Sequence, residues 1–148
     1  MSIKDRILDD IKTAMRAGDK SRRDALRLIS SEVKRREVDE RVEVDDAAAI
    51  ALLDKMAKQR RESIEQYEQA GRDELAERER FELHIIEEYL PAPLDTAELA
   101  ALIDGALSET GARSIKDMGR VMGILKPKVQ GRADMSEVSN LVKSKLAD

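Results

Sequence analysis

The stretch that decides the fold is Ser114–Leu146, which reads SIKDMGRVMGILKPKVQGRADMSEVSNLVKSKL. Its apolar residues recur every three or four positions on both sides of a short turn that contains Gly131, the spacing of amphipathic helices. The pattern therefore predicts two helices joined by a basic turn. Pro127 is expected to kink or end the first helix near Leu125, because proline lacks the backbone N–H that a helix interior needs.

Two glycines stand out in the first of these helices. Gly119 and Gly123 lie four residues apart and therefore on one side of it. Each costs about 1 kcal/mol relative to alanine in a helix interior. A pair at this spacing predicts that another backbone approaches closely, and we expect a neighbouring helix there rather than a ligand.

The same periodicity predicts five more helices towards the N-terminus. They are expected to begin near Ser2, Asp19 or Ser21, Asp45 or Asp46, Asp73 and Asp95, and to end near Gly18, Arg36, Ala70, Tyr89 and Gly111. The polar run 36–44 is predicted to be a loop. The inward faces of the seven helices are expected to include Ile7, Leu8, Met15, Leu26, Ile29, Leu53, Phe81, Ile86, Ile103, Ile115, Val121, Leu125, Val138 and Leu141.

The segment Leu90–Leu94, LPAPL, is the clearest boundary in the chain, because two prolines at alternate positions cannot continue a helix. We predict an all-α fold with an N-terminal helical domain at residues 1–90 and a C-terminal three-helix domain at 91–148. The two long helices on either side of Gly71 should form an αα-hairpin within the N-terminal bundle.

The composition narrows the class of protein. Of the 148 residues, 41% are hydrophobic but only 2% are aromatic, which favours helices over strands. Cysteine is absent, so thiolate nucleophiles and cysteine-ligated metals are excluded. No apolar run approaches the roughly 18 residues of a membrane span, and the N-terminus does not have the form of a signal peptide. We expect a soluble cytoplasmic protein without a membrane partner.

The net charge of −4 hides two basic windows. Lys20–Arg36 carries seven cations against two acids, and Arg113–Arg132 carries six against Asp117 alone. A solvated helix face explains the first window. For the second, the choice lies between a solvated turn capped by Asp134 and a site for a polyanion, since lysine and arginine bind phosphates without regard to sequence. The residues proposed to bind nucleic acid are Arg120, Lys126, Lys128, Gly131 and Arg132.

Catalytic chemistry finds little support. His84 is the single histidine, and its neighbours Glu87 and Glu88 are what a charged helix surface ordinarily carries. No serine nucleophile signature and no phosphate-binding glycine loop is present. We expect no catalytic residues, no metal and no cofactor, and a protein that is not an enzyme by itself.

Four segments resemble the GatB/YqeY family. They are Asp117–Asp134 (DMGRVMGILKPKVQGRAD), Ala14–Lys20 (AMRAGDK), Ala25–Lys34 (ALRLISSEVK) and Glu87–Leu94 (EEYLPAPL). The resemblance covers nearly the whole chain and implies a stand-alone YqeY-like protein. It also implies an all-α fold, and a C-terminal part similar to the tail domain of GatB, which helps to hold tRNA in the glutamine-dependent amidotransferase. The matching positions are Lys126, Lys128, Gly131, Arg132, Ala133 and Asp134.

Three functional hypotheses stay open. The first is a non-catalytic accessory protein that binds tRNA, another folded RNA or tRNA-associated machinery through its basic C-terminal domain. With so few aromatic rings for base stacking, it would recognise RNA by shape and backbone. The second, implied by the resemblance, is a component of an amidotransferase-like carbon–nitrogen ligase that uses glutamine as amido donor, with amidotransferase or aminoacyl-tRNA machinery as partner. The third is a helical protein-interaction module built on the third and fourth helices. The sequence leaves the oligomeric state open.

Overall fold

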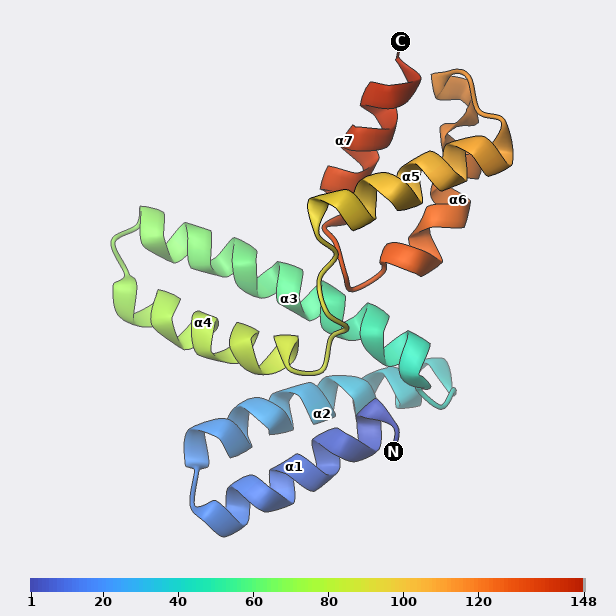
Figure 1. The fold of residues 1–148 in the computed structure, drawn as a ribbon. Helices are drawn as coiled ribbons and strands as arrows, with labels where there is room; N and C mark the ends of the chain where they lie inside the picture. Colours follow the sequence, from blue (N-terminus) through green and yellow to red (C-terminus); the bar gives the residue numbers. More distant parts are fainter. Residues whose placement is uncertain (148) are drawn as a thin grey trace. The chain divides into compact units, whose positions relative to one another are not determined.

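The computed structural model describes residues 1–147 and is all-helical over that range. It divides the chain into two compact units, Met1–Leu90 and Pro91–Asp148. The prediction of an all-α fold is confirmed. Figure 1 shows the order of the helices along the chain.

The first unit consists of two antiparallel helical hairpins. Helices α1 (Ile3–Ala17) and α2 (Lys20–Glu40) form one, and α3 (Asp46–Gln69) and α4 (Asp73–Glu87) form the other. Each hairpin turns at a glycine in the left-handed region, Gly18 and Gly71, both with φ of 70°. Side chains with a β-carbon avoid this conformation, so glycine at these two positions fixes where the helices end.

Aliphatic side chains from all four helices form one core in this unit. Its fully buried members include Ile7, Leu26, Ile29, Leu53 and Ile86. Polar contacts also join the helices at the edge of this core. The Ile3 N–H donates to Asp46 Oδ1 at 2.9 Å, which satisfies a free donor at the start of α1.

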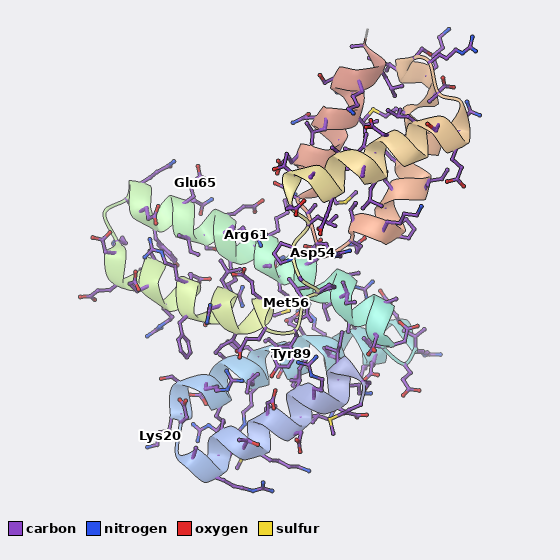
Figure 2. All side chains as sticks on the ribbon, in the orientation of Figure 1. Lys20, Asp54, Met56, Arg61, Glu65 and Tyr89 are labelled. Atoms are coloured by element: carbon purple, nitrogen blue, oxygen red, sulfur yellow. The ribbon has the colours of Figure 1, made fainter. Side chains whose placement is uncertain are left out.

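Tyr89 fastens the end of α4 to the α1–α2 hairpin (Figure 2). Its hydroxyl donates to Asp10 on α1, and the Arg6 guanidinium lies over its ring at 5.2 Å from the centroid. Burial, followed by the hydrogen bond to Asp10, raises the pKa of Tyr89. The adjacent Glu88 accepts from Arg22 on α2 at 2.8 Å. This cluster gives the EEYLP segment a structural role.

The second unit is built from α5 (Thr96–Thr110), a 3₁₀ turn η1 (Ile115–Asp117), α6 (Met118–Val129) and α7 (Met135–Leu146). Asp95 and Glu98 form the predicted capping box at the start of α5, with the Glu98 N–H donating to Asp95 Oδ1 at 2.7 Å. A separate core lies among the three helices. It contains Leu99, Ile103, Ala106, Val121, Leu125, Val129, Val138, Val142 and Leu146.

The predicted loop at residues 36–44 is wrong in its first half. Helix α2 continues to Glu40 and ends at Arg41, which has a φ of 55°. Arg35 pairs with Asp39 at 3.8 Å and Arg36 with Glu40 at 3.3 Å, both four residues apart. Such pairs stabilise a polar helix that has no apolar stripe to mark it.

Of the two effects expected from Pro127, an end of the helix near Leu125 is wrong, because α6 runs through Pro127 to Val129. The last turn persists because Val129 is fully buried in the core and because the Gln130 N–H donates to the Lys126 carbonyl at 3.0 Å. Packing thus outweighs the local preference of one proline.

Several apolar residues placed on the inward faces are exposed instead. They are Leu8, Met15, Phe81, Ile115 and Leu141. Leu8, Met15, Phe81 and Leu141 stand at the margins of their helix stripes, where a small rotation moves a side chain from core to surface. Ile115 lies in the 3₁₀ turn η1, because α6 begins at Met118 rather than near Ser114. Ala14 and Met56 take up buried positions that the sequence did not single out.

Candidate nucleic-acid interface

Lys126 and Lys128 stand in the last turn of α6 and are both exposed. Neither makes an ion pair with any residue that the structure describes. Lysines at a helix C-terminus are stabilised by the helix dipole by about 0.3–1 kcal/mol. Part of this basic character therefore has a structural explanation.

The two lysines lie on different sides of α6. Successive helix residues are rotated by about 100°, so side chains two apart point about 160° away from each other. Lys126 and Lys128 accordingly flank the buried stripe of Val121, Leu125 and Val129 on opposite sides. A ligand that lies against one side of α6 therefore contacts only one of these two lysines.

Arg132 and Gly131 stabilise the turn between α6 and α7. Arg132 Nε donates to the Ala92 carbonyl at 2.9 Å, and the Arg132 carbonyl accepts from the Leu94 N–H at 2.9 Å. Gly131 has a φ of 74°. Arg132 therefore fastens the proline-containing segment at the start of this unit to the α6–α7 turn.

Arg120 has an acidic partner. Its Nη2 donates to Asp117 Oδ1 at 2.6 Å, while Asp117 Oδ2 accepts from the backbone N–H groups of Arg113 and Ser114. The Arg113 N–H, followed by Arg120, holds the pKa of Asp117 below its usual value. The carboxylate stays ionised and neutralises the Arg120 guanidinium. The five residues proposed from the sequence are thus not brought together into one site.

A shallow groove between α6 and α7 brings a different set of residues together. It has a volume of ≈ 410 Å³ and is lined by Met122, Met135, Ser136, Ser139 and Asn140. The methionines form the apolar part, and the hydroxyl and amide groups stand along the α7 side. These polar groups donate and accept hydrogen bonds without carrying charge.

Two lysines belong to the same face. Lys126 follows Met122 by four residues on α6, and Lys143 follows Ser139 by four on α7, so each lies one turn from a groove residue. Both are exposed. Lys145 differs, because it pairs with Asp104 of α5.

The α6 side of this face is open. Gly119 and Gly123 are exposed, and a β-carbon added to either would meet nothing within 4 Å. The expectation that a neighbouring helix approaches these glycines is therefore wrong for the residues that the structure describes. The glycines leave free space beside Lys126 instead.

We call this surface the α6–α7 face, defined by Gly119, Met122, Gly123, Lys126, Met135, Ser136, Ser139, Asn140 and Lys143. None of these nine residues is acidic, but two acids border the face on its α7 side. Glu137 precedes Asn140 by three residues, and the Asp134 carboxylate caps α7 by accepting from the Ser136 N–H at 3.0 Å.

Sequence reasoning missed the α7 half of this face. Ser136, Ser139, Asn140 and Lys143 recur at the three- and four-residue spacing of one helix side. A search for polar rather than apolar periodicity would have found them. The spacing of Gly119 and Gly123 marks the α6 half of this face, but spacing alone predicts a packing surface.

Metal binding has no geometric support in residues 1–147, where no three histidine, aspartate or glutamate side chains gather in a way that holds an ion. His84 is exposed on α4, and its neighbour Glu88 is engaged by Arg22.

Within residues 1–147, no helix is long and apolar enough to cross a membrane.

Known proteins resemble this chain along most of its length. A curated relative named "Altered inheritance of mitochondria protein 41, mitochondrial" from Eremothecium gossypii is 37% identical over 103 residues, covering 68% of this chain and 56% of the relative. The protein of the same name from Pyrenophora tritici-repentis is 31% identical over 137 residues, covering 89% and 74%. The one from Lachancea thermotolerans is 36% identical over 103 residues, covering 68% and 55%.

The cytoplasmic location expected from the sequence is wrong by this comparison, because these relatives are named as mitochondrial proteins. The physical reason for the error is that composition does not distinguish one aqueous compartment from another.

The chain spans only 56% and 55% of the Eremothecium and Lachancea proteins.

The family model described as "Yqey-like protein" matches residues 4–146, which includes both compact units. The similarity therefore extends over the hairpins of the first unit as well as the α6–α7 turn, while the likeness to the GatB tail stays a prediction. The chain belongs to the YqeY-like protein family.

Proposed function

We propose that the protein is a non-catalytic RNA-binding accessory factor, with tRNA as the leading ligand, and that the α6–α7 face contacts the sugar–phosphate backbone. The observation that carries the proposal is the composition of this face. It combines two lysines that make no ion pair among residues 1–147, two hydroxyls, an amide and two exposed glycines, and none of the nine residues that define it is acidic.

Each component suits a nucleic-acid backbone. Lysine ammonium groups displace condensed counterions from phosphates, which gives affinity that falls steeply with salt. Serine hydroxyls and the Asn140 amide donate to phosphate oxygens and to the 2′-hydroxyls of RNA. Gly119 and Gly123 leave room for the ribose chain to lie close to α6.

The glycines also argue against a purely structural role for this face. Gly123, inside α6, costs about 1 kcal/mol relative to alanine, although no described neighbour needs the space beside it or beside Gly119 in the first turn. A ligand that approaches closely gives a reason for this cost.

Recognition by shape and backbone fits the distribution of aromatic rings. Tyr67, Phe81 and Tyr89 all lie in the first unit, so residues 91–148 offer no ring on which a base could stack. The resemblance of this unit to a tRNA-holding tail domain supports tRNA as the first ligand to test. The amidotransferase alternative rests on that resemblance alone.

The test is the affinity of labelled bulk tRNA for the full chain, measured by fluorescence anisotropy. Lys126→Glu/Lys143→Glu should weaken binding by at least about tenfold, equivalent to about 1.4 kcal/mol. Lys128→Glu is the matched control for each single variant, Lys126→Glu and Lys143→Glu, because it also reverses one charge but lies on the opposite side of α6 from Lys126. The absence of binding by the native protein at low salt would overturn the proposal.

A further inference from the structure

A second groove lies in the first unit, along the seam between α1 and α2. It has a volume of ≈ 340 Å³, with Ile7 and Val33, both buried, at its floor. Ser30 and Lys34 line it from α2, and Leu8 lines it from α1. The Lys4–Glu37 ion pair, at 2.8 Å, closes one end.

Leu8 is the exposed apolar residue on the α1 side of this groove, and the apolar surface continues along α1 beyond the residues that line the groove. Leu8 is 43% exposed and Met15 is 53% exposed, and they stand seven residues apart with the half-buried Ile11 between them. Residues at this spacing lie on one helix side. Three aliphatic or thioether side chains thus form a continuous stripe over two turns of α1.

The α2 side carries two cations, Lys34 in the groove and Arg27 beyond its end. Arg27 and Lys34 are also seven residues apart, and each lies opposite a member of the apolar stripe. Arg27 Nη2 donates to Met15 Sδ at 3.6 Å, and Lys34 lines the groove with Leu8. Seven residues of α-helix span about 10.5 Å, so the two charges stand about two helical turns apart.

Among the described residues, Arg27, Lys34 and Lys20 at the first position of α2 are the cations of this helix without an ion pair. Arg22, Arg23, Arg35 and Arg36 all pair with acids. Arg27 and Lys34 make no ion pair with a residue in the described range 1–147. Glu37, the acid at the end of the groove, is already engaged by Lys4 and by the Val44 N–H, which lower its pKa.

From this arrangement we propose that the α1–α2 groove docks an acidic amphipathic helix of a protein partner. Such a helix would place an apolar ridge against Leu8, Ile11 and Met15. Two carboxylates, seven residues apart on its flank, would meet Arg27 and Lys34. This occupant is favoured because its carboxylates complement the charges of Arg27 and Lys34 and repeat their spacing of two helical turns.

Other occupants fit less well. A nucleic acid would meet the two cations but would gain nothing from the apolar stripe. A lipid surface favours apolar side chains that protrude, whereas here the buried floor of Ile7 and Val33 is recessed between two walls. A ridge of side chains from one helix matches a groove between two helices.

The experiment is a selection from a display library of helical peptides with seven randomised surface positions, using the full-length chain as bait. The enriched peptides should carry Asp or Glu at two positions seven apart, with Leu, Ile, Met or Val at the three- and four-residue positions between them. The affinity of an enriched peptide should fall at least tenfold for Arg27→Glu/Lys34→Glu and for Leu8→Ser/Met15→Ser.

Lys55→Glu/Lys58→Glu on α3 makes the same change in net charge and should leave peptide affinity unchanged. All altered side chains are exposed, and circular dichroism will report whether each variant folds. A library without binders, enriched peptides without the acidic spacing, or equal binding to Arg27→Glu/Lys34→Glu would overturn the proposal. Sedimentation with anionic vesicles, or a dimer in light scattering, that Arg27→Glu/Lys34→Glu abolishes would instead assign the groove to lipid or to a second copy.

Discussion

The basic windows Lys20–Arg36 and Arg113–Arg132 look alike in the sequence but differ in how their charges are neutralised. In the first, four of seven cations pair with acids, three of them on acids of α2 itself and the fourth on Glu88. In the second, Arg120 pairs with Asp117 and Arg132 binds a backbone carbonyl, while Lys126 and Lys128 make no ion pair among the described residues.

The surroundings of the unpaired cations also differ. Arg27 and Lys34 border an apolar stripe, whereas Lys126 borders hydroxyl, amide and glycine positions together with Lys143, which lies beyond the second window on α7. The comparison shows that the density of lysine and arginine does not define a ligand class. The spacing of acids and the chemistry of adjacent side chains do so, and they suggest a helix for one unit and RNA for the other.

The largest expected effect concerns whether each unit has its own core. Leu26→Ala and Leu125→Ala each remove a fully buried side chain and should lower the free energy of unfolding by about 2–5 kcal/mol. Hydrogen exchange should increase in α1–α4 for the first variant and in α5–α7 for the second. Increased exchange throughout the chain in both variants would contradict the separation of cores.

Arg132 tests which cations of the turn are structural. Arg132→Ala removes the charged donor to the Ala92 carbonyl and should destabilise the second unit by roughly 1.5–3 kcal/mol. Lys128→Ala, an exposed change without a described partner, should stay within about 0.5 kcal/mol. Urea denaturation followed by circular dichroism measures both, and equal effects would show that Arg132 does not fasten the segment.

The glycine pair should separate stability from binding. Gly119→Ala and Gly123→Ala meet open space, and Gly123→Ala, inside α6, should stabilise the helix by about 1 kcal/mol, with a smaller gain for Gly119→Ala in the first turn. The added methyl groups should nevertheless weaken tRNA binding, because they occupy the room left for the ribose chain. Gly105→Ala on α5, equally open, is the control and should leave binding unchanged. Stabilised variants with undiminished tRNA affinity would show that the glycines are not part of the interface.

The smallest expected effect lies at the charge cluster between α3 and α4. Arg60 Nε lies 2.8 Å from Glu82 Oε2 and 3.4 Å from Glu79 Oε2. The geometry leaves Arg60 Nε and Glu79 Oε2 without a hydrogen bond among the described residues. Burial raises the pKa of Glu79, with Arg60 opposing the shift.

A carboxyl group whose folded-state pKa is raised favours the native state below its unfolded-state pKa and loses that contribution as pH rises through the folded value. Glu79→Gln should therefore match the native protein in acid and exceed it at neutral pH, by less than about 1 kcal/mol since the site is partly solvated. Glu82→Gln should be neutral or destabilising at pH 7. Thermal unfolding between pH 3 and 7 measures both, and a destabilised Glu79→Gln at pH 7 would contradict the account.

Much of the fold was predictable because its signals are local. Asp19, Asp45, Asp95 and Asp134 cap their helices, and glycines at 18, 71 and 111 end them. The prediction failed where a local signal competed with packing or pairing. The i,i+4 ion pairs extended α2 through a polar run, and the burial of Val129 carried α6 past Pro127.

The candidate site was less predictable, because a sequence shows which side chains are charged but not which way they point in the folded protein. Lys126 and Lys128 are neighbours in the sequence and point to opposite sides of α6. Lys143, seventeen residues beyond Lys126, joins Lys126 on one face only once the turn at Gly131 has brought α7 back along α6. Likewise, only the structure shows that Arg132 donates a hydrogen bond to the Ala92 carbonyl and that Gly119 and Gly123 face open space.

The most direct measurement of the central claim is the salt dependence of tRNA binding for the native chain, Lys126→Glu, Lys143→Glu and Lys128→Glu. If the α6–α7 face contacts the phosphate backbone, the slope of log affinity against log salt should fall by about one for each groove lysine and should stay near the native value for Lys128→Glu. Equal slopes for all four proteins, or a loss confined to Lys128→Glu, would contradict the proposed interface.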